Sequence, residues 1–278
     1  CYLFASSTLF YIAALGRFLT GFGGAFAFIG ALKLATLWFP PSMLGMLAGA
    51  TQAMGMLGAA AGEKIMNDAI HHLGWQSAMI ITGHILALLA VIMGLLIREH
   101  PSQAKAQVKM QKPASGILQG LQQVFRNPQS WINGCYAGLI FAPTGAFAEV
   151  WGPTYLEHVR HISDQDAALI NTFIFIGWGI GAPLTGKLSD WLGRRKPILI
   201  ISALLSFLTF TIILYWPNLS LNAMLFWASC YGLANTGLVC SYAIAGEINP
   251  KYLSGISMAF ANMASVIIGV LFLPLIGH

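Results

Sequence analysis

Long apolar runs separated by short polar joints dominate this chain. Runs of about 20 residues are long enough for an α-helix to cross a hydrocarbon core about 30 Å thick. The runs are continuously apolar rather than alternating, and they are rich in Gly and Ala, which argues against the strands of a barrel. We therefore predict an all-α polytopic membrane protein. Its eight expected crossings are 9–35, 42–65, 75–97, 131–153, 166–186, 197–216, 220–245 and 254–276.

The first apolar stretch is too long for one crossing, because residues 1–6 extend it at its start. We expect a turn at residues 6–8, between the tail of an earlier helix and the helix that follows. The chain is therefore expected to begin inside the membrane. No charged segment followed by an apolar core precedes Cys1, so we expect no signal peptide.

Composition agrees with this pattern, since 57% of the residues are hydrophobic and 8% are charged. The basic residues fix the orientation, because Lys and Arg near helix ends stay on the cytoplasmic side. With the loop from Arg98 to Arg126 inside, only Lys64 and Arg160 lie outside. The basic residues expected inside are Arg98, Lys105, Lys109, Lys112, Arg126, Lys187, Arg194, Arg195, Lys196 and Lys251. Topology thus explains the net charge of +5, and a nucleic-acid partner is not expected.

A polar, basic joint at 98–130 separates two groups of crossings. We interpret it as a cytoplasmic linker between 1–97, part of an N-terminal helix bundle, and 131–278, a C-terminal bundle. The segment GILQGLQQVF, which starts at Gly116, has an apolar stripe at helical spacing. It is either a short amphipathic helix on the membrane surface or a solvated tether.

A charged turn, GKLSDWLGRRKP at 186–197, lies between two apolar runs. Its Gly-x-x-x-Asp-x-x-Gly-Arg-Arg-Lys pattern resembles the signature loop of the major facilitator superfamily. The resemblance implies two pseudo-symmetric helix bundles that rock about a central site. It also implies a conformational latch made of Gly186, Asp190, Gly193, Arg194 and Arg195.

In such a latch, the Asp190 carboxylate accepts N–H groups at the start of a neighbouring helix while the guanidinium groups hold it in place. The resemblance and the symmetry of the halves imply that this helix starts at Pro41–Gly45. The latch would favour the outward-open state. The alternative is that the basic residues only obey the positive-inside rule.

A weak internal repeat supports two related halves. Pro40, Gly45 and Gln52 match Pro250, Gly255 and Asn262 at one common offset, as parallel transporter repeats do. On this basis the chain resembles helices four to eleven of twelve, with the tail of helix three, truncated at both ends. The C-terminal bundle would then lack its last helix.

Two ionisable residues within crossings are candidates for a substrate or proton site. Arg17 resembles the family's arginine on helix four, and a charge at this depth usually faces a cavity or a partner. It would bind a substrate carboxylate or couple protons, with a structural ion pair as the alternative. Glu149 is a proton site, a partner for an ammonium group, or an interfacial carboxylate beside Trp151.

Uncharged polar residues within the crossings widen the list of cavity candidates. They could line a site near the bilayer midplane, although hydrogen bonding between helices explains any one of them as well. These residues are Gln52, Tyr136, Asn171, Trp178, Asn235, Tyr242 and Asn262.

Metal, cofactor and enzyme chemistry find no support in the sequence. His158 and His161 form a lone H-x-x-H in an outer loop, and the four cysteines have no C-x-x-C spacing. No nucleophile, base and orienting acid can be placed together. We expect no cofactor, no metal and no catalytic residue.

We therefore expect a secondary active transporter in a bilayer, with a small-molecule substrate and protons as the coupling ion. The expected cargo is an amino acid, a short peptide or an organic anion. Met56 after Gly55 departs from the Gly-Pro motif of drug-proton antiporters, which favours uptake by symport over export. Export by proton antiport and a non-transporting membrane sensor or partner-binding module remain the alternatives. We expect a bacterial inner membrane location.

Overall fold

The computed structural model describes residues 1–7, 9–39, 43–96 and 117–276. Throughout these ranges the regular structure is helical and no strand occurs. Six helical segments are long and apolar enough to cross a membrane, and their ranges are Phe10–Ala35, Trp75–Leu96, Asp164–Leu192, Arg195–Tyr215, Leu221–Glu247 and Lys251–Pro274. The expectation of an all-α polytopic protein is confirmed to this extent.

The other two predicted crossings also fall on helical segments. The run at 42–65 becomes α3 (Leu44–Leu73), whose second half contains acidic and basic residues. The run at 131–153 is divided into α7 (Pro128–Pro143), the π-helix η2 (Thr144–Trp151) and α8 (Gly152–His158). That both cross the membrane stays a prediction.

The chain packs as two compact units, the first made of residues 1–38 and 58–110 and the second of 39–57 and 111–278. In the first unit, α1 (Tyr2–Ser6) lies against α2 (Phe10–Trp38) and α4 (Trp75–Leu96). The ring of Tyr2 meets His84 edge-on, with centroids 5.3 Å apart. A methyl group on Gly16 would lie 2.7 Å from the backbone nitrogen of Phe4, so the missing side chain lets α1 and α2 approach.

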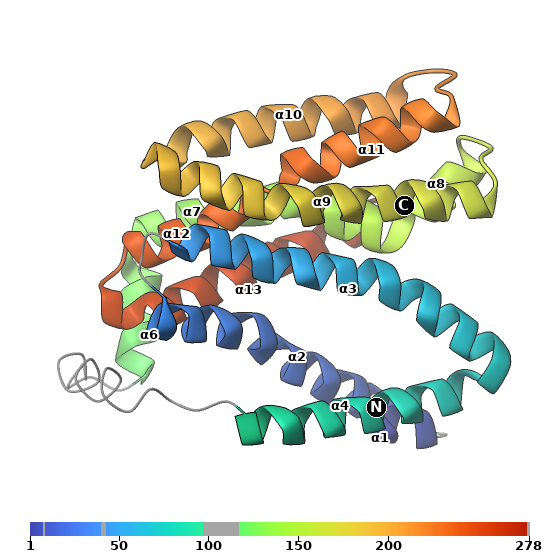
Figure 1. Cartoon of the computed structure of the whole chain (residues 1–278), viewed down its shortest axis with the longest axis horizontal. Coiled ribbons are helices and arrows are strands. Elements are labelled where there is room, and N and C mark those ends of the chain that lie inside the picture. The colour runs from blue at the N-terminus through green and yellow to red at the C-terminus, as the bar shows by residue number, and fades with distance from the viewer. Residues whose placement is uncertain (8, 40–42, 97–116, 277–278) are drawn as a thin grey trace. The chain divides into compact units, whose positions relative to one another are not determined.

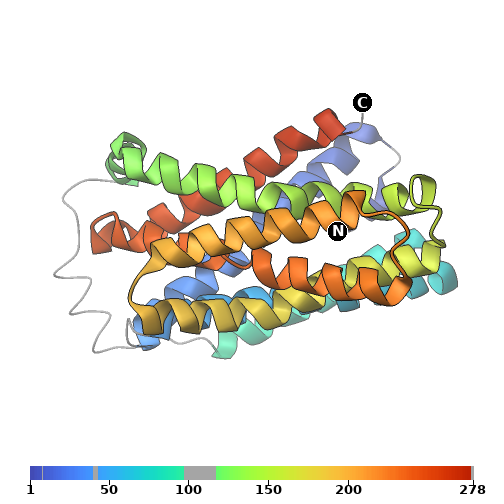
Figure 2. The same ribbon diagram turned by 90° about the horizontal axis from the view of Figure 1, so that it is seen from above.

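The second unit contains two closely packed helix pairs (Figure 1). One pair is α7 with α13 (Ser254–Ile276), and the other is α9 (Asp164–Leu192) with α11 (Leu221–Asn235). The helix α10 (Arg195–Tyr215) runs beside α11, as both views of this unit agree (Figures 1 and 2). Added methyl groups on Gly177 and Gly232 would clash with backbone carbonyls across the α9–α11 contact, so these glycines permit the close packing.

Side-chain caps explain where three helices of the second unit begin. Asn127 accepts a hydrogen bond from the N–H of Gln129, Ser163 from Asp166 and Ser220 from Ala223. At the other end of α9, Gly193 has a left-handed φ of 60°, a conformation that favours glycine. The chain therefore turns sharply at Gly193 and begins α10 two residues later.

The crossing predicted at 220–245 contains a break. Its first part, α11, ends at Asn235, and its second part, α12, spans Leu238–Glu247. The N–H of Gly237 in the break donates to Ser202 Oγ over 2.9 Å, and the hydroxyl groups of Thr185 and Thr236 lie 2.6 Å apart. Polar side chains from α9 and α10 therefore form hydrogen bonds with the polar groups at the break between α11 and α12.

The amphipathic segment of the predicted linker forms α6 (Ile117–Arg126). Its Val124 is fully buried with Leu253 of η3 (Lys251–Leu253) and with Phe260 of α13. The Tyr252 hydroxyl donates to Gln123 Oε1 over 2.9 Å. The segment is therefore a short helix, as one of the two alternatives had it, and its apolar stripe packs on the second unit. A position on the membrane surface stays a prediction. Residues 98–116 of the predicted linker lie outside the described residues.

Candidate functional site

The charged turn between α9 and α10 folds back on itself. Arg195 Nη1 lies 2.8 Å from Asp190 Oδ1, and it also donates to Ser189 Oγ over 2.6 Å. The left-handed Gly193 makes this possible, because it brings the first residue of α10 beside the last turn of α9. Asp190 and Arg195 are mostly shielded, with 13% and 18% of their side chains exposed.

A third charged residue, Glu247 at the end of α12, joins them. Its Oε1 accepts from Arg195 Nη2 over 2.9 Å and from Nε over 3.1 Å. We call Asp190, Arg195 and Glu247 the charged cluster. Glu247 was not among the site residues predicted from the sequence, although an acidic residue at the predicted cytoplasmic end of a crossing, where basic residues prevail, was a usable signal.

Asp190 also reaches α3 within the same unit. Its Oδ2 accepts from the N–H of Met46, 3.2 Å away, in the first turn of α3. A carboxylate here is stabilised by the positive end of the helix dipole. Pro41 and Ser42, part of the predicted partner segment, lie outside the described residues, but Gly45 adjoins Asp190.

Small residues make this approach of α3 to α9 possible. An added methyl group on Gly45 would lie 2.6 Å from both carboxylate oxygens of Asp190. On Gly49 it would clash with the carbonyl of Ala182, and on Gly186 with the carbonyl of Gly45. The two helices therefore touch backbone to backbone beside Asp190, and any larger residue would separate them.

Arg194 differs from Arg195 although both belong to the predicted latch. It is exposed and occupies the N-cap position of α10, where its side chain makes no capping bond. Within the described ranges no ion pair or hydrogen bond is found for its side chain. Gly186 and Gly193 have backbone roles, and the assignment of all five residues to a latch stays a prediction.

The π-helix η2 brings a second set of polar contacts together. The N–H of Gly152 bonds to Phe147 O, five residues back. Pro153, the next residue, has no N–H to offer. The carbonyl of Ala148 therefore loses its helical donor, and the amide of Asn171 on α9 replaces it at 2.7 Å.

At the start of η2, Asn235 of α11 has a similar role. Its Nδ2 donates to Ile140 O over 2.8 Å, and its Oδ1 accepts from Thr144 Oγ1 over 3.3 Å. The hydroxyl of Tyr231 lies 2.9 Å from Thr144 Oγ1. Asn235, Thr144 and Tyr231 are all fully buried. Asn171 and Asn235, two of the predicted cavity residues, thus hold η2 to its neighbours, which we call the amide contacts.

The other cavity candidates fall into three groups. Trp178 and Tyr242 are buried, and the Tyr242 hydroxyl donates to Asn262 Oδ1 over 3.1 Å. The half-buried ones are Gln52, Tyr136 and Asn262, with Tyr136 donating to Leu199 O over 2.9 Å. Glu149 is exposed on η2. The structure therefore brings Tyr242 and Asn262 together, and the assignment of these residues to a common cavity stays a prediction.

Arg17 belongs to the first unit, where it is exposed on α2. The described residues offer it no ion pair or hydrogen bond, and the glycines that follow it, Gly21, Gly23 and Gly24, have open space beside them. A charge within an apolar, membrane-spanning helix usually faces a cavity or a partner.

The family model of the Major Facilitator Superfamily matches residues 1–273. The chain belongs to this superfamily. The resemblance inferred from the charged turn is confirmed, and the all-helical fold is the one that the superfamily implies. No group of three or more His, Cys, Asp or Glu residues suited to a metal occurs in the described part of the chain.

Three relatives within the superfamily show what the chain is similar to. It is 24% identical to the "Probable galactarate/D-glucarate transporter GudP" of Escherichia coli (strain K12), over 94% of this chain and 64% of the relative. It is 25% identical to the "Citrate-proton symporter" of Salmonella typhi, over 77% of this chain and 49% of the relative. It is 23% identical to the "Lysosomal dipeptide transporter MFSD1" of Gallus gallus, over 90% of this chain and 58% of the relative.

The chain thus spans about half to two-thirds of the length of these relatives. All three are named for transport, which agrees with the expectation of a transporter rather than an enzyme.

Proposed function

We propose that the protein is a secondary active transporter that takes up a small organic anion together with protons, by alternating access. Membership of the superfamily supports the transporter class. The names of two relatives support the cargo, since galactarate, D-glucarate and citrate are carboxylates, and one relative is named a proton symporter. The proposal includes a bacterial inner membrane, bundles at 1–97 and 131–278, and a cytoplasmic linker at 98–130.

The observation that carries the choice of an anion is the position of Arg17, a cation within the apolar segment Phe10–Ala35 that is long enough to cross a membrane. A guanidinium group recognises a carboxylate with two parallel hydrogen bonds, and in an apolar setting this pairing is stronger than in water. We assign Arg17 the role of binding the substrate carboxylate. Glu149, which is exposed on η2, is the proposed proton site.

The charged cluster has a different proposed role, which is to stabilise one conformational state. Asp190 joins α9 to the first turn of α3, and Arg195 and Glu247 hold its carboxylate in position. We propose that these contacts exist in the outward-open state and break when the cytoplasmic side opens. They are partly exposed and consist of a few charge-assisted hydrogen bonds, so they can be broken at modest cost.

Uptake by the full-length protein in proteoliposomes tests this function. Labelled galactarate, D-glucarate, citrate and a dipeptide are each supplied with and without an inward proton gradient. We expect one carboxylate to accumulate, faster with the gradient, and Arg17→Gln to reduce its uptake at least tenfold. Arg126→Gln, which removes an exposed cation from α6, is the matched control and should retain wild-type uptake.

Other outcomes separate the alternatives. Accumulation of the dipeptide alone would replace the anion by a peptide, as the third relative's name suggests. Loss of preloaded substrate driven by the gradient would indicate export. Thermal stabilisation by a carboxylate with no transport in either direction would indicate a sensor. Wild-type uptake by a folded Arg17→Gln protein would return Arg17 to a structural role.

A further inference from the structure

The charged cluster adjoins a second set of contacts at the same end of the second unit, where α6 lies beside α12 (Figure 1). Glu247, which accepts from Arg195, is the last residue of α12. The next two residues are Ile248 and Asn249. Asn127, between α6 and α7, donates through Nδ2 to Ile248 O and to Asn249 Oδ1, each over 3.0 Å. Three consecutive residues therefore connect the charged cluster to the end of α6.

These bonds hold the end of α12 in place. The last carbonyls of an α-helix have no partner within the helix, and a helix end without partners frays. At α12, the amide of Asn127 supplies a donor to Ile248 O. Asn249 is buried and donates to Ser130 Oγ of α7 over 3.0 Å. Side chains at the junction of α6 and α7 thus hold the last turn of α12, where the second carboxylate of the charged cluster lies.

The helix α6 is itself packed on the segment that follows α12. Its Val124 side chain is fully buried against Leu253 of η3. A methyl group on Gly120 would lie 2.9 Å from side-chain atoms of both Ile256 and Leu253, so α6 approaches this segment closely. Asn127 follows α6 directly, and its N–H donates to Val124 O over 3.2 Å. The bonds that the Asn127 side chain makes to the end of α12 therefore depend on a docked α6.

We propose that α6, through Asn127, positions Glu247 and so stabilises the state in which the charged cluster is intact. With α6 docked, the end of α12 is fixed and the Glu247 carboxylate stays within reach of Arg195. When α6 moves away, the last turn of α12 loosens, Arg195 loses one of its two carboxylates, and Asp190 is held less firmly against α3. A displacement of the predicted linker, which ends in α6, would therefore change the balance of states. This inference rests on the role proposed above for the charged cluster.

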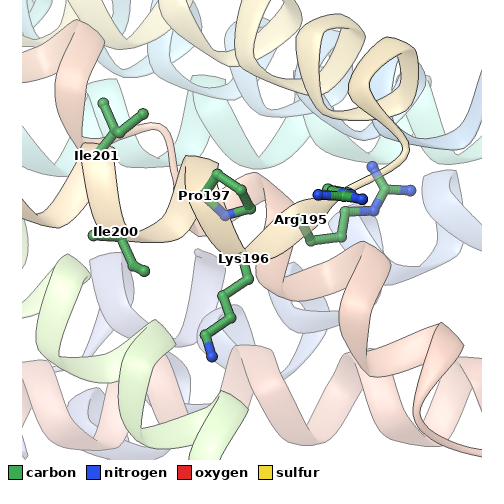
Figure 3. Close-up of a pocket in the computed structure, with 6 residues that line it drawn as sticks. Arg195, Lys196, Pro197, Ile200 and Ile201 are labelled. Atoms are coloured by element: carbon green, nitrogen blue, oxygen red, sulfur yellow. The ribbon is translucent and has the colours of Figure 1, made fainter.

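Two variants of the full-length protein release the end of α12 by different routes. Asn127→Ser keeps a hydroxyl group that can cap α7 but removes the amide donor. Gly120→Leu keeps α6 helical and pushes it away from η3 and α13. Its matched control is Gln122→Leu, at an exposed position on the other side of α6. Lys196→Gln is a control for charge, because Lys196 extends away from Arg195 in the close-up of the start of α10 (Figure 3).

Two measurements are made on these variants. Hydrogen exchange reports the last turn of α12, and we expect both variants to speed it by about tenfold, with both controls at the wild-type rate. Maleimide labelling reports opening of the cytoplasmic side, with the buried Cys240 of α12 as the only cysteine. We expect labelling to be about threefold faster in both variants and in Glu247→Ala. Adding Asn127→Ser to Glu247→Ala should cause no further increase, because the positioned carboxylate is already absent.

The outcomes separate this inference from the role of the charged cluster. If Glu247→Ala leaves Cys240 labelling unchanged, the cluster does not set the balance of states, and the role of α6 is overturned with it. If Glu247→Ala speeds labelling but Asn127→Ser and Gly120→Leu do not, only the inference about α6 is overturned. Additive effects of Asn127→Ser and Glu247→Ala, or an equal effect of Gln122→Leu, would also overturn it. Melting temperatures show which variants fold, and Gly120→Ala replaces Gly120→Leu if the larger side chain prevents folding.

Discussion

The charged cluster and the amide contacts both tie helices of the second unit together, but they rely on different physics. In the cluster, Glu247 is 53% exposed and accepts two charge-assisted hydrogen bonds from Arg195. At η2, Asn171 and Asn235 are buried, and their side-chain amides donate hydrogen bonds to backbone carbonyls of a distorted helix. Water and salt can replace the first kind of contact, whereas nothing in the described structure replaces the second. The cluster is therefore suited to breaking during a transport cycle, and the amide contacts to persisting through it.

The largest effect expected from this comparison is at Asn235. Asn235→Ala leaves Ile140 O and the hydroxyl groups of Thr144 and Tyr231 short of a partner, at about 1–3 kcal/mol for an unsatisfied buried group. We expect a loss of about 3 kcal/mol in unfolding free energy, measured by denaturant titration in micelles, and a smaller loss for Asn171→Ala. Asn222→Ala, at an exposed position of the same helix, should change it by less than about 0.5 kcal/mol.

Salt distinguishes the two kinds of contact further. The loss in unfolding free energy caused by Asn235→Ala should be the same at low salt and at about 1 M salt, where the Debye length is about 3 Å. A loss that disappears at high salt would mean that Asn235 acts through the charged cluster and not through the carbonyls of the π-helix.

The second effect concerns the balance of states. Asp190→Asn removes the charge that faces Arg195 and the first turn of α3, so the state that needs this contact loses about 1 kcal/mol. We expect a shift toward the inward-open form of roughly tenfold or less, read as lower accessibility of labels on the outer side. Glu247→Gln should shift it in the same direction by less, since Glu247 is more exposed. Unchanged labelling in both variants would contradict the proposal that the charged cluster stabilises the outward-open state.

The smallest effect belongs to Glu157, which lies outside the membrane-spanning segments. A hydrogen bond with the Asp164 side chain raises the pKa of the Glu157 carboxyl, because the shared proton separates two acidic groups. The folded state then holds this proton more tightly than the unfolded state. The contribution of this pair to stability is therefore fully present below the usual glutamate pKa of about 4.3, and it is lost as pH rises through the higher folded-state pKa.

Glu157→Gln should flatten this part of the pH dependence. The melting temperature is measured at several pH values from acidic to neutral, with Asp166→Asn as the control at a nearby carboxylate. Identical profiles for the wild type and Glu157→Gln would show that the two carboxyl groups do not interact in solution.

The sequence alone was enough to determine the environment and the class of fold. Apolar runs of membrane-spanning length can satisfy their backbone only as helices, and the Gly-x-x-x-Asp-x-x-Gly-Arg-Arg-Lys pattern indicated the superfamily. The turn at Gly193 was equally local, because a glycine after an apolar helix is the usual residue for a left-handed end. Each of these conclusions depends on neighbours along the chain.

Tertiary structure decided which polar groups meet. Only the folded chain separates Arg195, which is paired, from Arg194, for which the described residues supply no partner, although the two are adjacent in sequence and chemically identical. It also turns Asn171 and Asn235 from candidate cavity residues into partners of Ala148 O and Ile140 O. Pro143 and Pro153 indicate a disturbed helix in the sequence. The side chains that donate to its carbonyls come from other helices, however. Hydrogen bonds between distant segments depend on helix rotation and depth, which the order of residues along one helix does not fix.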